Sequence, residues 1–155
     1  MTVRVLFVCL GNICRSPMAE AVFCSQVQEA GLEEQFEIDS AGTSSWHVGE
    51  KAHRGTRSVL EDHDITYDGR SRQINSKDKD KDWTYIIAMD QSNMRELRRT
   101  FSDHPRLYLL LDFATQSDIR DVPDPYFTGN FESVYWLVED GSRGLLAEIR
   151  RQEAI

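Results

Sequence analysis

The chain has 155 residues, of which 40% are hydrophobic, and a formal net charge of −8 at pH 7. This length and hydrophobic share suffice for one folded domain over residues 1–155, and they exclude a disordered chain. The negative charge argues against a nucleic-acid partner and against attraction to an anionic membrane surface.

The cysteines and the N-terminal residues both point to the cytoplasm. The three cysteines, Cys9, Cys14 and Cys24, are clustered and odd in number, which is not the pattern of a disulfide framework. Free thiols persist in a reducing compartment. The first residues run into an apolar segment without a signal-peptide pattern, and no segment approaches membrane-spanning length. We therefore expect a cytoplasmic protein without a membrane anchor, and further a monomer or weak homo-oligomer.

The first predicted elements are a strand, a short loop and a helix. Val3–Cys9 is almost continuously apolar, as is typical of a parallel strand covered on both faces. A helix is predicted to open at Pro17, with Ser16 as its N-cap, because these residue types favour those positions. Apolar residues at helical spacing follow, and Gly31 is expected to end the helix.

The rest of the chain alternates between strand and helix patterns. The later predicted elements are a strand at 36–40, a loop at 41–49, a helix at 52–62, an irregular stretch at 65–69, an extended piece at 72–74, a strand at 83–89, a helix at 90–100, a strand at 107–111, a loop at 118–129 and a helix from Asn130. The alternating charges at 77–82 indicate a solvated turn or helix end. Gly141 and Gly144 are expected to loosen the last helix. This order predicts an α/β fold: a doubly wound, four-stranded parallel sheet with right-handed crossovers and helices on both faces.

The loop between the first strand and the first helix has the spacing Cys-x5-Arg, from Cys9 to Arg15. It lies at the carboxyl end of a strand, where open α/β sheets bind ligands. A loop that leads into a helix N-terminus can surround an anion with its backbone N–H groups. The same helix N-terminus and Arg15 favour the thiolate form of Cys9. We infer that Cys9 is a nucleophile and that the anion it attacks is a phosphate.

Other residues of the loop suit this chemistry. Arg15 can hold two phosphate oxygens with its planar fork, which a lysine cannot copy. Gly11 and Asn12 tolerate the backbone angles that turn successive N–H groups inward, and Ser16 can donate a hydrogen bond to the Cys9 sulfur. Taken alone, Cys-x5-Arg constrains only two positions, and Cys9 could be a small buried residue. The strand–loop–helix context favours the nucleophile.

Phosphoryl transfer to sulfur also requires a proton for the leaving oxygen, and Asp124 is the candidate donor. It lies between Pro123 and Pro125, which stiffen the backbone on both sides. The segment follows the fourth predicted strand, so it can reach the same sheet edge as Cys9. Asp124 would protonate the leaving phenolate and then accept a proton from the attacking water. Taken by itself, however, this Asp-Pro pattern favours a surface turn.

Over essentially its full length, the chain resembles the low-molecular-weight protein tyrosine phosphatases. The resemblance rests on Cys9–Pro17 and on four segments in family order, at 40–43, 72–74, 89–93 and 124–126. It implies that Cys9 is the nucleophile, Arg15 the phosphate clamp and Asp124 the general acid. It also implies a phosphate-binding loop with its supporting residues, formed by Leu10, Gly11, Asn12, Ile13, Cys14, Ser16 and Ser40, the last of which braces Asn12.

The resemblance further implies that the substrates are phosphotyrosine-containing proteins. Aromatic residues wall the family's cleft, and the matching positions are Trp46 and Tyr126, with Leu10 and Ile13 on the loop. A deep phosphate site between aromatic walls selects phosphotyrosine, because phosphoserine is too short to reach the sulfur. His47 and Phe127 stand where the family varies, so we expect them to tune substrate preference. The alternative for Trp46 is core packing, which its polar neighbours disfavour.

Two positions bear on the support and the redox chemistry of the loop. Many family members carry a histidine three residues before the Arg-Gln-Ile segment, where this chain has Gly69. We therefore expect a less rigidly braced loop without loss of activity. Cys14 resembles the family's partner for a reversible disulfide with the nucleophile Cys9, which would make the enzyme redox-regulated. The alternative is a buried thiol without a role.

Three other functions share some of these features. Arsenate reductase has the same fold and loop but needs a further cysteine, and residues 25–155 contain none. A non-catalytic phosphotyrosine-binding module would not require both Cys9 and Asp124. A metal site at Cys9 and Cys14 lacks a second ligand pair, because the histidines are scattered. The favoured function is therefore a phosphatase that acts through a phosphocysteine intermediate on Cys9, without metal or cofactor.

Overall fold

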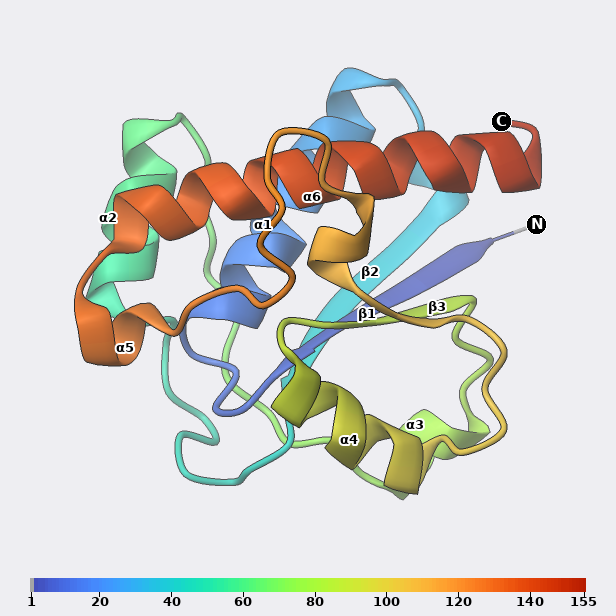
Figure 1. The fold of residues 1–155 in the computed structure, drawn as a ribbon, viewed down its shortest axis with the longest axis horizontal. Helices are drawn as coiled ribbons and strands as arrows, with labels where there is room; N and C mark the ends of the chain where they lie inside the picture. Colours follow the sequence, from blue (N-terminus) through green and yellow to red (C-terminus); the bar gives the residue numbers. More distant parts are fainter. Residues whose placement is uncertain (1) are drawn as a thin grey trace.

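The computed structural model describes residues 2–155 and contains a four-stranded parallel sheet in the order β2-β1-β3-β4 (Figure 1). The strands are β1 (Val3–Cys9), β2 (Phe36–Gly42), β3 (Tyr85–Ala88) and β4 (Leu107–Leu109). The helices are α1 (Arg15–Glu29), α2 (Arg54–Asp62), α3 (Ser76–Asp80), α4 (Gln91–Thr100), α5 (Pro125–Thr128) and α6 (Phe131–Glu153), with 3-10 turns η1 (Glu33–Gln35) and η2 (Leu110–Phe113). The predicted α/β fold is confirmed. In the described part of the chain, no helix is long and apolar enough to cross a membrane.

Helices cover both faces of the sheet, and the alternation of side chains along β1 divides the core between them. Val5 and Phe7 belong to the core beneath α1 and α6, whereas Leu6 and Val8 belong to the core beneath α4. Figure 1 shows α1, α2 and α6 on one side of the sheet and α3 and α4 on the other. Because both faces are covered, β1 reads as a nearly continuous apolar run. Full burial of each large aliphatic or aromatic side chain contributes about 1.5–3 kcal/mol to folding.

The first helix starts earlier than its sequence predicts. It begins at Arg15, with Cys14 in the N-cap position and no side chain bonded to the free N–H groups. The prediction of Ser16 as the N-cap was wrong, since Ser16 lies inside the helix, fully buried, with its hydroxyl facing Cys9. A capping side chain would occupy the N–H groups that an anion needs. The helix start is therefore set by the loop before it, not by cap preference.

The last helix, α6, is uninterrupted from Phe131 to Glu153, so the expectation that two glycines loosen it was wrong. A Cβ on Gly141 would lie 2.8 Å from Leu110 Cγ, and a Cβ on Gly144 would overlap the carbonyl oxygen of Phe113. These glycines instead let α6 approach η2 closely. Two nearby boundaries also differ: β4 ends at Leu109, where η2 begins, and the loop predicted at 118–129 contains α5.

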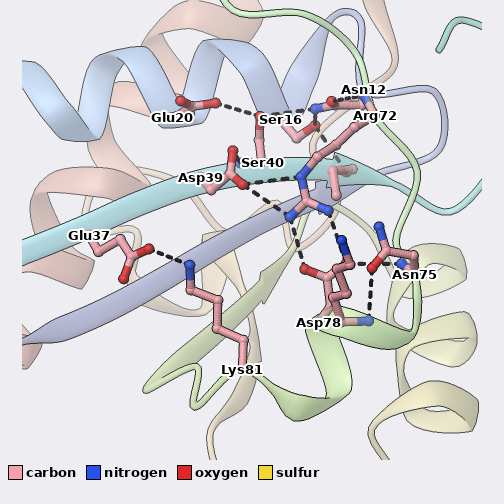
Figure 2. Close-up of polar contacts among 12 residues, drawn as sticks. Asn12, Ser16, Glu20, Glu37, Asp39, Ser40, Arg72, Asn75, Asp78 and Lys81 are labelled. Atoms are coloured by element: carbon pink, nitrogen blue, oxygen red, sulfur yellow. Dashed lines mark hydrogen bonds and ion pairs between the residues drawn. The ribbon is translucent and has the colours of Figure 1, made fainter. Parts of the chain in front are cut away.

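The alternating charges at 77–82 predicted a solvated turn or helix end, but this run is not wholly solvated. It contributes to α3, and within it Asp78 is buried. Arg72 donates to both carboxylate oxygens of Asp78, at 2.9 and 3.0 Å, and its Nε donates to Asp39 (Figure 2). Burial opposes the ionisation of Asp78, but the bonds from Arg72 and from the backbone N–H of Asn75 outweigh it and lower the pKa of Asp78. This pair anchors the predicted extended piece at 72–74, which bridges to the end of β2.

Candidate active site

Cys9 ends β1, and its sulfur lies at the centre of the loop that leads to Arg15. The residue is only 3% exposed. The backbone N–H of Asn12 donates to the sulfur at 3.3 Å, and the Ser16 hydroxyl lies 3.1 Å from it. Because Asn12 Nδ2 donates to Ser16 Oγ at 2.8 Å, the hydroxyl hydrogen of Ser16 is free to point at the sulfur. Both contacts therefore stabilise a thiolate more than a thiol.

The carbonyl groups of the loop are held by donors outside it. The acceptors and their donors are Cys9 O with Thr43 N, Leu10 O with Ser44 N, Gly11 O with Ser71 Oγ, Ile13 O with His53 N, and Cys14 O with Thr56 Oγ1, at 2.7–3.1 Å. A peptide group whose carbonyl points outward directs its N–H the other way. The loop is thus built to present N–H groups to one anion above the sulfur.

Asn12 holds the tightest bend of the loop. Its backbone has a φ of +54°, a left-handed angle that asparagine tolerates better than most residues. Its side-chain amide donates to Ser40 Oγ at 3.0 Å as well as to Ser16, and its Oδ1 accepts the backbone N–H of Arg72 at 3.0 Å (Figure 2). All the hydrogen-bonding groups of this side chain are therefore engaged, which fixes the bend.

Arg15 is a buried cation at the floor of the site, 3% exposed. Its Nη1 donates to Asp90 Oδ2 at 2.6 Å and to the carbonyl of Val122 at 3.0 Å, while its Nη2 lies 3.5 Å from Asp124 Oδ2. Burial opposes its charge, but Cys9 and the two carboxylates raise the pKa of Arg15 above its usual value. The guanidinium is therefore charged throughout the working pH range and positioned by fixed acceptors.

Asp124 lies beside Arg15, at the N-terminus of α5. Its Oδ1 accepts the backbone N–H of Tyr126 at 3.1 Å, so it caps α5. The Asp-Pro pattern taken by itself favours a surface turn, but the structure has a short helix here. Its N-cap residue, Asp124, lies beside Arg15. Its carboxylate is partly exposed.

An apolar cleft of about 280 Å³ lies over this loop. Three aromatic side chains form its exposed rim: Trp46 is 72% exposed, Tyr126 50% and Phe127 77%. The core-packing alternative for Trp46 was therefore wrong. The lining consists of Cys9, Leu10, Gly11, Ile13, Cys14, Arg15, Trp46, His47, Asp124, Tyr126 and Phe127. Three of the predicted site residues, Asn12, Ser16 and Ser40, do not line the cleft; hydrogen bonds from the Asn12 side chain to Ser16 and Ser40 support the loop.

Cys14 is buried beside the same cleft. Burial, together with the negative charges of Asp124 and Cys9, raises the pKa of its thiol to about 12. Cys14 therefore remains a thiol at neutral pH and does not compete with Cys9 as a nucleophile. Within residues 2–155, no group of three or more His, Cys, Asp or Glu side chains could hold a metal ion.

Two residues of the site were missed by sequence reasoning about single positions. Asp90 holds Arg15, and Glu20 accepts the Ser40 hydroxyl at 2.6 Å. Asp90 follows β3 after one residue, Met89, so its place at the carboxyl edge of the sheet was a usable signal. Glu20 lies on the first helix among apolar neighbours, where no local pattern distinguishes it from an exposed helical glutamate.

The comparisons with known proteins agree with this geometry. The family described as "Low molecular weight phosphotyrosine protein phosphatase" matches residues 4–154. The chain belongs to this family. It is 47% identical to the low molecular weight protein-tyrosine-phosphatase YfkJ of Bacillus subtilis over 99% of both chains, and 45% identical to a Streptomyces coelicolor member over 98% of this chain and 96% of that one. The family and enzyme class predicted from the sequence are confirmed.

Solved structures give the same result. The crystal structure of YfkJ superposes with a TM-score of 0.93 and covers 98% of this chain and 97% of that one. A structure titled as a Drosophila arginine phosphatase is 33% identical, with a TM-score of 0.86 over 94% of this chain and 97% of that one. The fold is therefore shared with phosphatases named for different phosphorylated residues.

Gly42, at the end of β2, allows the phosphate loop to lie close to the sheet. A Cβ at this position would lie 2.8 Å from Leu10 O and 3.0 Å from Gly11 C, both backbone atoms of the loop. We predict that Gly42→Ala displaces the loop and lowers kcat/KM for an aryl phosphate about tenfold or more. Steady-state kinetics with the exposed Ser45→Ala as control checks this. Unchanged kinetics in Gly42→Ala would show that the loop tolerates the displacement.

Proposed function

We propose that the protein is a protein tyrosine phosphatase that forms a phosphocysteine intermediate on Cys9. In the first step the Cys9 sulfur attacks phosphorus, and the bond from phosphorus to the tyrosine oxygen breaks. The leaving oxygen takes a proton from Asp124. Arg15 and the inward N–H groups stabilise the charge of the equatorial oxygens in the transition state. The observation that carries this proposal is the Cys9 sulfur beneath an anion site, with Arg15 and Asp124 beside it.

In the second step a water molecule replaces the phenol. Asp124, now ionised, accepts a proton from the water as its oxygen attacks phosphorus. The bond from sulfur to phosphorus breaks, inorganic phosphate is released and the Cys9 thiolate returns. The Ser16 hydroxyl supports this departure, because its hydrogen bond is stronger to the thiolate than to the phosphorylated sulfur. No metal ion or cofactor takes part in either step.

The shape and lining of the cleft favour phosphotyrosine as its substrate. The apolar walls accept a phenyl ring, and Trp46 and Tyr126 supply aromatic faces on which the ring can pack. Phosphoserine has no ring to span the distance from the rim to the buried sulfur. Phosphoarginine would bring a polar guanidinium group against the apolar loop residues Leu10 and Ile13. We propose that His47 and Phe127 adjust the preference among peptides, since both line the mouth.

We further propose that residues 1–155 act as one cytoplasmic phosphatase domain, as a monomer or weak homo-oligomer. The family match over residues 4–154 supports one phosphatase domain across these residues. The net charge of −8 opposes binding to nucleic acid or to an anionic membrane surface. The partners that we propose, from the family match, are phosphotyrosine-containing proteins.

Replacement of the two reacting groups tests the mechanism. We predict that Cys9→Ser abolishes hydrolysis of p-nitrophenyl phosphate and that Asp124→Ala lowers kcat about 10²–10⁴-fold. Cys24→Ser and Asp118→Ala, which change the same residue types outside the cleft, should retain activity. Quenched-flow trapping of a phosphorylated enzyme with intact Cys9 would reveal the intermediate. Full activity in Cys9→Ser would refute the proposed nucleophile.

The aromatic rim can be tested with substrates that differ in their phosphorylated residue. We predict hydrolysis of phosphotyrosine peptides well above that of phosphoserine or phosphoarginine peptides of the same sequence. Trp46→Ala should raise KM for the phosphotyrosine peptide about tenfold, the value of one aromatic contact. Trp136→Ala, which removes an exposed tryptophan from α6, is the matched control. Faster hydrolysis of phosphoarginine would contradict the proposed specificity.

We also propose that Cys14 protects Cys9 by forming a reversible disulfide. Peroxide would oxidise the Cys9 thiolate to a sulfenic acid. The Cys14 sulfur would then attack the Cys9 sulfur, releasing water and forming the disulfide. One charge that raises the pKa of Cys14 is that of the Cys9 thiolate itself. Conversion to a neutral sulfenic acid removes that charge, so Cys14 becomes easier to ionise when its reaction is needed.

Peroxide treatment followed by mass mapping tests this protection. The wild type should yield a Cys9–Cys14 disulfide, and dithiothreitol should restore its activity. Cys14→Ser should instead accumulate sulfinic or sulfonic acid on Cys9 and recover little activity. Cys24→Ser should behave like the wild type. Detection of only sulfonic acid on Cys9 in the wild type would refute the protective role.

A further inference from the structure

Gly69, where many family members carry a histidine, leaves a space that the hydroxyl group of Tyr67 fills. A Cβ on Gly69 would overlap the hydroxyl oxygen of Tyr67. That hydroxyl donates to Glu20 Oε1 at 2.9 Å. The expectation of a thinner brace at this point therefore overlooked Tyr67, two residues before the glycine.

The contact made by Tyr67 continues through a chain of hydrogen bonds to the nucleophile. Glu20 also accepts the Ser40 hydroxyl at 2.6 Å, and Ser40 Oγ accepts Asn12 Nδ2 at 3.0 Å. The second hydrogen of the Asn12 amide goes to Ser16 Oγ, whose own hydrogen is then free for the Cys9 sulfur. Figure 2 shows the contacts that run from Glu20 through Ser40 to Asn12, with Ser16 beside them. With Glu20 accepting both hydroxyl groups, every donor in this chain has a partner, and the Ser16 hydroxyl lies nearer the Cys9 sulfur, at 3.1 Å, than its other acceptor, the carbonyl of Ala41, at 3.5 Å.

We propose that Tyr67 is a positioning residue for Cys9: its hydroxyl group holds Glu20 as an acceptor and so fixes the hydrogen-bond chain that directs the Ser16 hydroxyl to the nucleophilic sulfur. The inference rests on the proposed role of Cys9 and assigns its remote support. Tyr67 does not touch the substrate cleft, and its effect would reach the sulfur only through the bonds above.

The charges around Glu20 make the donor from Tyr67 important. Burial raises the pKa of Glu20, and nearby Asp39 raises it further, whereas the hydrogen bonds from Ser40 and Tyr67 and the charge of Arg72 lower it. On its own helix Glu20 also faces the Cys24 thiol, which is protonated at neutral pH because burial raises its pKa to about 12. Burial and the neighbouring Glu20 charge raise the pKa of Tyr67, so it remains a donor. If the Tyr67 hydroxyl were removed, Glu20 would take up a proton more readily, and its hydrogen bond from the Ser40 hydroxyl would weaken, because a neutral carboxyl group is a weaker acceptor than a carboxylate.

Tyr67→Phe tests the proposal, because it removes one oxygen atom and keeps the ring. The rate of Cys9 alkylation by iodoacetamide, measured against pH, should shift its midpoint upward by about half a pH unit. The kcat/KM for p-nitrophenyl phosphate should fall about three- to tenfold on the acidic side of neutral pH, with thermal unfolding measured in parallel. Tyr108→Phe is the matched control, since within residues 2–155 the Tyr108 hydroxyl makes no hydrogen bond to the protein. An unchanged alkylation midpoint in folded Tyr67→Phe would overturn the inference.

Substitutions at Gly69 give an independent test of the same contact. Gly69→Ala should displace the Tyr67 hydroxyl and reproduce the shift of Tyr67→Phe, and the double variant should shift no further than either single variant. Tyr67→Ala combined with Gly69→His, which removes the ring whose Cζ would lie 2.6 Å from a Cβ at position 69, should move the midpoint back toward that of the wild type relative to Tyr67→Ala alone. Additive shifts in the double variant would also overturn the inference. If the wild-type protein itself showed no turnover or no alkylation of Cys9, the result would instead count against the proposed function, so the two failures are distinguishable.

Discussion

The site depends on one constraint, namely that the carbonyl groups of the phosphate loop must point away from the anion. Five of them do so by accepting hydrogen bonds from groups outside the loop. Those donors come from the end of β2, from the segment before α2, from α2 itself and from Ser71. A carbonyl without such a donor could turn inward at little cost and would repel a phosphate. The elements around the loop thus maintain its polarity as well as its shape.

The same constraint explains how an acidic protein can bind an anion. The bound phosphate would experience the local N–H groups and Arg15, not the net charge of −8. Asp90 orients Arg15 from behind at 2.6 Å, whereas Asp124 lies farther away, at 3.5 Å on the side of the cleft. The tighter carboxylate contact therefore positions the guanidinium, and the looser one leaves Asp124 available for the proton transfer proposed above.

The sheet and the loop were predictable because their signals are local. The apolar run of β1 and the Cys-x5-Arg spacing each lie within one short segment. The failures involve contacts between distant segments. Asp78 is buried against Arg72, which reaches it from the preceding extended segment, and Gly144 supports close packing because η2 passes beneath it. Ser16 resembles an N-cap by type, but the anion site needs the free N–H groups, and the hydroxyl is used for the Cys9 sulfur instead.

The pairing of Gly69 with Tyr67 shows how a change at one position can be compensated nearby. The segment 65–69 has no helical structure, and in an extended chain residues two apart point to the same side. The same space can therefore be filled by a large side chain at position 67 when the residue at position 69 is small. Reading Gly69 alone identifies only the loss of a side chain. The compensating residue, Tyr67, is identified only from the direction of its side chain. What the site needs is a hydrogen-bond donor to Glu20, and not a particular residue type at position 69.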